Sequence, residues 1–140
     1  CWEQWNGFYS QIHSTFPYIG GWFYRGLAGI QWDPEKPGFK NIILRPALVN
    51  SVDWVNCSYE SHYGNIVSNW KMEADQFEWE VSIPTNSTAG VYIPGNSITE
   101  GGSPVEDAVG VTFIKDEATT TMMRLYGSPM RWATSSPDCT

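Results

Sequence analysis

Residues Phe77–Ile83 alternate strictly between apolar and polar side chains. Successive side chains of a strand point to opposite faces of a sheet, so this period predicts a strand with one buried and one solvated face. Ile66–Met72 alternates more loosely, and residues 73–76 (EADQ) connect the two segments. We therefore expect a β-hairpin with one apolar face. The side chains expected to face inward are Trp70, Trp79, Val81 and Ile83.

Five further short segments carry strand-forming residues and are separated by turns rich in Pro, Gly, Asn or Ser. They are residues 41–45, 52–59, 90–93, 111–114 and 122–126. A succession of short strands with regular turn signals is typical of an antiparallel β-sandwich, which we expect over residues 39–134. The polar stretch 95–110 contains Gly101-Gly102 and is expected to be a loop.

The period changes in the first thirty residues. Apolar side chains recur there at intervals of three and four, at Ile19, Trp22, Phe23, Leu27 and Ile30. This spacing predicts a helix over residues 17–30 that packs through its apolar side, with Gly29 suited to its end. Because one helix cannot bury its own apolar stripe, we expect partner helices from a part of the protein upstream of this chain.

Residues 32–38 separate the two patterns, since they include two Pro and a Gly. The charges are also divided here: residues 1–30 contain one carboxylate and one Arg, and the remaining acids and bases follow. The fold class expected from the residues is therefore mixed, with a helical segment before a β-sandwich. We place a first unit at residues 1–36 and the sandwich at residues 39–134.

Composition narrows the classes of partner. The chain has 8 basic and 15 acidic residues, for a net charge of −7, and its bases are scattered singly. This balance argues against nucleic acid or an anionic membrane as a partner. No apolar run is long enough to cross a bilayer. The three Cys lack metal-ligand spacing, so we expect no metal site and no cofactor, and the cellular compartment stays open.

Two polar residues near the N-terminus are candidates for chemistry. Glu3 lies between Trp2 and Trp5, and a carboxylate beside indole rings suits a sugar site. The alternative is an ordinary helix-terminal Glu beside core aromatics. His13 precedes the expected helix, where a loop residue can face a pocket, but a lone His is more often structural or exposed. Spacing alone favours the structural interpretation of both residues.

Longer strings point to a family. They are residues 2–5 (WEQW), 10–13 (SQIH), 20–30 (GGWFYRGLAGI), 37–46 (PGFKNIILRP), 58–64 (SYESHYG), 81–89 (VSIPTNSTA) and 98–104 (ITEGGSP). In this order they resemble the α-L-rhamnosidases of glycoside hydrolase family 78, over roughly residues 2–133. The first three strings resemble the end of the catalytic barrel, and the others resemble the C-terminal β-sandwich.

The resemblance implies a specific fold and reaction. In the family an (α/α)6 barrel carries the active site and precedes the sandwich, so this chain would be the last barrel segment plus the C-terminal domain. The family hydrolyses terminal α-L-rhamnosyl bonds with inversion, between a general acid and a general base. Glu3 matches the general base, and His13, Trp2 and Trp5 match substrate-binding positions. The general acid would lie upstream, so the chain alone is expected to be inactive.

Three departures from the family pattern bear on substrate contacts. Asn6 stands where an Asp commonly follows the Trp, Gln11-Ile12 replaces the usual Leu-Asn, and Gly21 stands where an acid often precedes Trp22. The expected partners are rhamnose-containing glycosides and the upstream barrel helices of the same protein.

Two other functions remain alternatives. The first is a non-catalytic carbohydrate-binding or accessory module that binds sugar through Trp70 and Trp79; the alternating pattern speaks against it, because it places both rings in the core. The second is another (α/α)6-barrel glycosidase, or an inactive relative, which the residues upstream would decide.

Overall fold

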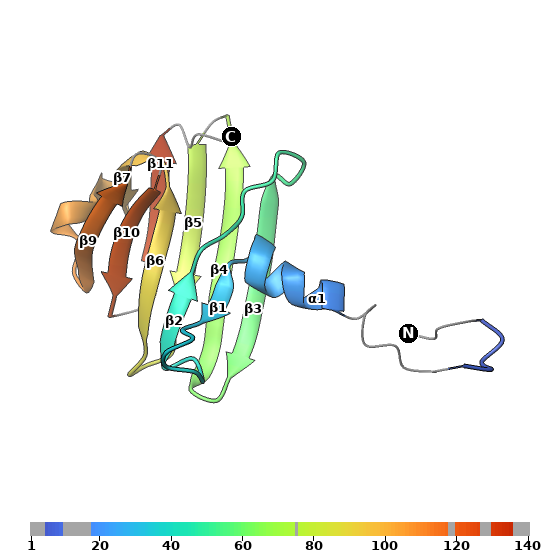
Figure 1. Ribbon diagram of the computed structural model, residues 1–140. Coiled ribbons are helices and arrows are strands. Elements are labelled where there is room, and N and C mark those ends of the chain that lie inside the picture. The colour runs from blue at the N-terminus through green and yellow to red at the C-terminus, as the bar shows by residue number, and fades with distance from the viewer. Residues whose placement is uncertain (1–4, 10–17, 75, 118–119, 127–129, 136–140) are drawn as a thin grey trace.

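The computed structural model describes residues 5–9, 18–74, 76–117, 120–126 and 130–135. They form a β-sandwich of two facing sheets with a short helix at one edge (Figure 1). The helical elements are α1 (Tyr18–Trp22), the π-helical η1 (Phe23–Leu27) and the 3-10 turn η2 (Val105–Asp107). The strands are β1 (Ile30–Trp32), β2 (Asn41–Leu44), β3 (Trp54–Ser61), β4 (Gly64–Glu73), β5 (Gln76–Ser82), β6 (Thr88–Pro94), β7 (Asn96–Glu100), β8 (Ser103–Pro104), β9 (Val111–Glu117), β10 (Thr120–Leu125) and β11 (Met130–Ser135). Within these ranges, no helix is long and apolar enough to span a membrane.

The first sheet has five strands in the order β1-β2-β6-β10-β9. Its neighbours pair antiparallel except β2 and β6, which run parallel, with Asn41 opposite Thr88. The sandwich is therefore mainly antiparallel, and the expected antiparallel pairing does not hold at this one pair. A parallel neighbour requires a long crossover, and the β3–β4–β5 meander of the other sheet supplies it.

The second sheet has six strands in the order β3-β4-β5-β11-β7-β8. The predicted hairpin forms its centre, with Trp70 opposite Trp79 and Lys71 opposite Glu78. Trp70, Trp79, Val81 and Ile83 are all buried, at 2%, 0%, 0% and 5% exposure, so the predicted register is confirmed. A shift of one residue would have placed the Glu side chains of β5 in the core instead.

A row of aromatic rings fills the core beneath this sheet. Trp70, Phe77, Trp79 and Trp132 lie in sequence, with centroids of successive rings 6.0, 5.9 and 5.8 Å apart. Tilted and edge contacts at such distances are favourable beyond their area burial. The row joins β4, β5 and β11, so three neighbouring strands share one packed layer.

Two segments differ from the sequence expectation. Residues 96–100 form strand β7 inside the stretch expected to be a loop, and its Ile98 is buried. One apolar side chain among polar neighbours gave no period to detect. Strand β11 was also missed, although its Trp132 is fully buried. Both strands pair with each other near one edge of the sheet, where position in the sheet rather than local pattern makes them strands.

The helix is shorter than expected. Within the described residues it covers 18–27, and Ile30 belongs to strand β1, where it pairs with Leu44 of β2. Gly29 separates the two elements with a φ of 72°, a left-handed conformation that suits glycine. Sheet pairing thus begins at Ile30, nine residues before the start of the sandwich expected from the sequence. The division into two units, with bounds at residues 36 and 39, stays a prediction.

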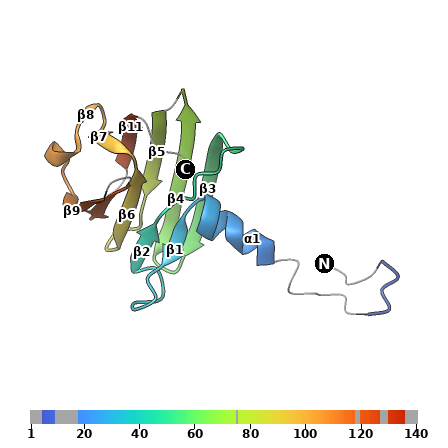
Figure 2. The same cartoon turned by 45° about the horizontal axis from the view of Figure 1, so that its top comes forward.

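Both views place the helix beside β3, at one edge of the sandwich (Figures 1 and 2). The helix axis points away from the sheets, so most of the helix surface faces outward. Leu27, in its last turn, is buried against the sandwich at 8% exposure.

Candidate functional site

The residues that the resemblance assigns to the sugar site fall mostly outside the described ranges. Glu3, His13 and Trp2 lie in residues 1–4 and 10–17. Trp5 is described and is 98% exposed, so the described residues leave its ring in solvent. Glu3, His13 and Trp2 thus lie outside the described residues, and the roles of all four side chains stay predictions.

The end of the helix is attached to the sandwich through five consecutive carbonyl oxygens, those of residues 25–29. The carbonyls at the end of an isolated helix have no partner within the helix. Here each accepts a hydrogen bond of 2.7–2.9 Å from a residue of the sandwich. The donors, in order, are Gln31 Nε2, Ala47 N, Trp70 Nε1, Ser68 Oγ and Arg45 N. The last turn is consequently fixed to both sheets, since these donors come from β1, β4 and the chain just after β2.

Ser68 is the buried polar residue at the centre of this attachment. Its hydroxyl donates to the carbonyl of Ala28 at 2.7 Å and accepts from Trp79 Nε1 at 3.0 Å. The side chain is 0% exposed, so both bonds lie in the core. Sequence reasoning did not single out Ser68. The sequence held one signal for it: Ser68 lies two residues from both Ile66 and Trp70, so it falls on the same inward face of β4.

The outward side of the helix is rich in exposed apolar residues. We expected packing through Trp22, Phe23 and Leu27, but Trp22 and Phe23 are 47% and 52% exposed, and only Leu27 is buried. Tyr18 and Ile19 are also exposed. A hollow of about 640 Å³ separates the helix from the first half of β3, and Phe23, Tyr24 and Val55 are among the residues that line it. An apolar helix face beside a hollow is typical of a surface that another element covers.

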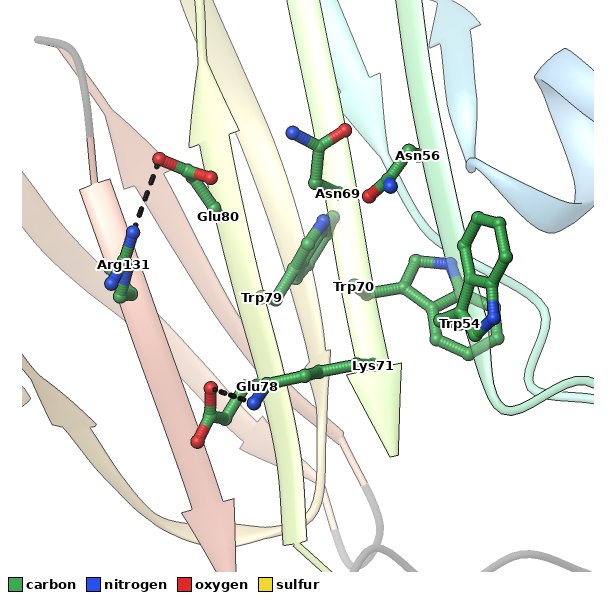
Figure 3. A pocket seen from close by; sticks show the side chains of 9 residues that line it. All are labelled: Trp54, Asn56, Asn69, Trp70, Lys71, Glu78, Trp79, Glu80 and Arg131. Carbon is green, nitrogen blue, oxygen red and sulfur yellow. Dashed lines mark hydrogen bonds and ion pairs between the residues drawn. The ribbon is translucent and has the colours of Figure 1, made fainter. Parts of the chain in front are cut away.

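The outer face of the six-stranded sheet carries a second, more polar hollow of about 390 Å³ (Figure 3). Two cross-strand rows form it. One row runs Trp54, Lys71, Glu78 over β3, β4 and β5, and the other runs Asn56, Asn69, Glu80, Arg131 over β3, β4, β5 and β11. Trp70 and Trp79 lie beneath, in the core.

The charged groups of this face are paired with one another. Lys71 Nζ lies 3.1 Å from Glu78 and 3.2 Å from Glu73, and Arg131 lies 3.5 Å from Glu80. Hydrogen bonds to Glu78 and then Glu73 raise the pKa of Lys71 above its ordinary value. Solvent-exposed pairs of this kind contribute little to stability. Because these pairs engage the charged groups, the face offers hydrogen-bonding groups rather than a free acid and a free base.

The inner side of β3 carries a thiol. Cys57 is partly buried beside the hollow under the helix, and burial raises the pKa of its thiol. Its backbone N–H donates to Asn69 Oδ1 at 3.1 Å. A thiol with a raised pKa carries little thiolate near neutral pH, so we assign Cys57 no chemistry.

Known proteins that are similar to this chain in sequence include α-L-rhamnosidases. An α-L-rhamnosidase of Alteromonas sp. (strain LOR) is 31% identical over an alignment of 106 residues, and the match covers 68% of this chain and 11% of that protein. An α-L-rhamnosidase of Streptomyces avermitilis is 27% identical over an alignment of 106 residues, and the match covers 68% of this chain and 10% of that protein. The chain thus spans about a tenth of the length of these curated relatives.

Solved structures share the same fold. The crystal structure of the Streptomyces avermitilis α-L-rhamnosidase complexed with L-rhamnose superposes with a TM-score of 0.75 and 21% identity, over 96% of this chain and 13% of that one. The α-L-rhamnosidase from Dictyoglumus thermophilum gives 0.75 and 22%, over 86% of this chain and 14% of that one. At such identities the likeness establishes fold alone. Residues 29–106, more than half of the chain, match the family described as bacterial alpha-L-rhamnosidase C-terminal domain, and the chain therefore belongs to that family.

Proposed function

We propose that this chain is the C-terminal part of an inverting α-L-rhamnosidase, a glycoside hydrolase that releases terminal α-L-rhamnose from rhamnosides. The observation that carries this proposal is the family match over residues 29–106. The names of the curated relatives support it, since both reported above are α-L-rhamnosidases.

In this proposal residues 1–36 end an (α/α)6 catalytic barrel and residues 39–134 form the accessory sandwich. The exposed apolar side of the helix supports the first part, because Trp22 and Phe23 offer a surface that further barrel helices can cover. The attachment of residues 25–29 supports a positioning role for the sandwich. Five hydrogen bonds to consecutive carbonyls hold the end of the last barrel helix against a rigid sheet.

The proposed chemistry needs two carboxyl groups. Inverting hydrolysis uses a general acid that protonates the leaving oxygen and a general base that activates water, about 6.5–9.5 Å apart. We assign the base to Glu3 and the acid to the upstream barrel. His13, Trp2 and Trp5 would hold the rhamnose, the indoles by stacking and the imidazole by a hydrogen bond.

The test compares the whole protein with this chain. The whole protein should hydrolyse an aryl α-L-rhamnoside, and proton NMR of the first product should show the β-anomer. The purified 140-residue chain should show no turnover, because it lacks the acid. Retention of configuration would contradict the assignment of Glu3 as a base, since retention requires a nucleophile.

The alternatives make different predictions in the same assay. Another (α/α)6-barrel glycosidase would hydrolyse a different aryl glycoside in preference to the rhamnoside. An inactive relative would leave every glycoside intact in the whole protein. A non-catalytic carbohydrate-binding module would take no part in hydrolysis, so Glu3→Gln would leave the activity of the whole protein unchanged. Sugar binding through Trp70 and Trp79 is not available to such a module, because both rings are buried.

A further inference from the structure

Trp54 is the exposed tryptophan whose ring has no partner among the residues that the structure describes in the sandwich and helix. It is 64% exposed at the start of β3, where it lines both the outer hollow and the hollow beside the helix. The other half-exposed indoles are engaged: Trp22 contacts Phe23 edge-on, and Arg25 lies 4.5 Å above Trp32. A large apolar ring held on a strand in solvent costs free energy, which a ligand stacked on it would recover.

Lys71, directly opposite Trp54, does not cover the ring. Its ammonium points to Glu78 on β5, away from the indole (Figure 3), and is held there at 3.1 Å. Glu73 holds the same ammonium at 3.2 Å. In both pairs the ammonium lies away from the indole, so Lys71 does not compete with a ligand for the ring.

Amide groups stand next to the open ring. Asn56 is two residues further along β3, on the same face, and lies opposite Asn69 of β4. In the described part of the chain the side chain of Asn56 makes no hydrogen bond, and Asn69 uses only Oδ1, which accepts from the N–H of Cys57. Both side chains therefore have donors free for a ligand.

The balance of charge selects a neutral ligand. Three carboxylates, those of Glu73, Glu78 and Glu80, face two cations, Lys71 and Arg131, and all are paired. The whole chain carries a net charge of −7. An anionic ligand would meet a negative potential here, and a cation would find its carboxylates already occupied.

We propose that the outer face around Trp54 binds a neutral pyranose ring, with the apolar C–H side of the sugar on the indole and its hydroxyls on Asn56 and Asn69. The hollow of about 390 Å³ has room for one or two such rings. The site is non-catalytic, because its carboxylates are ion-paired. It would hold a neutral glycan near the enzyme. Only the choice of rhamnose as the sugar rests on the function proposed above.

The test is an NMR titration of the 140-residue chain with methyl α-L-rhamnopyranoside. We expect saturable shifts of the Trp54 indole N–H and of the Asn56 and Asn69 amides, unchanged by added salt. Trp54→Ala should weaken binding by about tenfold or more, since stacking supplies most of the contact. Asn56→Ala should weaken it severalfold without disturbing the fold. Trp22→Ala, at an exposed indole elsewhere, is the matched control and should bind as the wild type does.

Each other outcome overturns a defined part of the proposal. Absence of saturable shifts, or equal binding by Trp54→Ala and wild type, would contradict the site. Concentration-dependent shifts of the same amides without sugar would mean that a second copy of the chain covers the face. Binding of methyl β-D-glucopyranoside but not of the rhamnoside would retain the site and overturn its link to rhamnose.

In the whole protein, Trp54→Ala should leave kcat on a small aryl rhamnoside unchanged. An inactive whole protein would count against the proposed function without altering the result of the titration.

Discussion

The indole N–H of Trp70 donates a 2.8 Å hydrogen bond to the carbonyl oxygen of Leu27, which joins the centre of the six-stranded sheet to the end of the helix. Both residues are buried, at 2% and 8% exposure. Trp70→Phe keeps most of the apolar volume but leaves this carbonyl without its donor. We expect a loss of about 1–3 kcal/mol in the free energy of unfolding, measured by urea denaturation. Trp54→Phe, at an exposed position, should change stability by less than about 0.5 kcal/mol. Equal stability of the two variants would contradict the attachment.

Ser68→Ala should be more costly than its size suggests. The substitution leaves two buried groups unpaired, the carbonyl of Ala28 and the indole N–H of Trp79. At about 1–3 kcal/mol for each unpaired group, we expect a combined loss of about 2–4 kcal/mol after partial relaxation. Ser58→Ala, on the exposed side of β3, is the control and should be nearly neutral. A double-mutant cycle of Ser68→Ala with Trp79→Phe should give a coupling of at least about 0.5 kcal/mol, and additive effects would contradict the shared hydrogen bond.

Two glycines of the helical segment should respond in opposite ways to alanine. Gly29 has a φ of 72°, and a Cβ there would lie 2.3 Å from the backbone of Arg45 and Pro46, so Gly29→Ala should destabilise strongly or prevent folding. A Cβ at Gly21 would meet nothing within 4 Å, and Gly21→Ala should stabilise the helix by up to about 1 kcal/mol. Thermal unfolding followed by circular dichroism distinguishes the two. A tolerated Gly29→Ala would contradict the described connection between helix and β1.

The hairpin and the core were predictable because their signal is local. Phe77–Ile83 alternates strictly, and burial of Trp79 and Val81 follows from that period alone. Strands β7 and β11 could not be predicted in this way, since their conformation depends on pairing with each other and with β5. The end of the helix depends likewise on partners far along the chain, including Ser68 and Trp70.

The two candidate sites also differ in how far the sequence predicts them. The role of Glu3 came from the resemblance of whole strings, because a single carboxylate between indoles has low specificity. The surface around Trp54 could not be predicted from one strand. Its rows form only when β3, β4, β5 and β11 are placed in register.

Stability should fall at alkaline pH partly through Cys57. Burial raises the pKa of this thiol above its ordinary value of 9.0. The thiol in the native state therefore keeps its proton at a pH where the thiol in the unfolded state has lost it. The contribution of Cys57 to the free energy of unfolding is complete below pH 9.0 and is lost as pH rises through the native pKa. Urea midpoints at about pH 8 and about pH 10 should differ more in the wild type than in Cys57→Ala. The same pH dependence in both proteins would contradict this assignment.

His13→Ala in the whole protein tests the proposed sugar contact. If His13 only binds the rhamnose, its loss should raise KM or lower kcat/KM while the water-activating step continues. Steady-state kinetics on an aryl α-L-rhamnoside separates these parameters. A loss of kcat as large as that from removing the base would contradict a binding role.

Glu3→Gln in the whole protein tests the central claim most directly. Glutamine keeps the size and hydrogen-bonding reach of Glu3 but cannot take a proton from water. We predict that kcat on an aryl α-L-rhamnoside falls by about 10²–10⁴-fold, the range typical of a positioned base, while rhamnose still binds. A kcat close to that of the wild type would contradict the assignment of Glu3 as the general base.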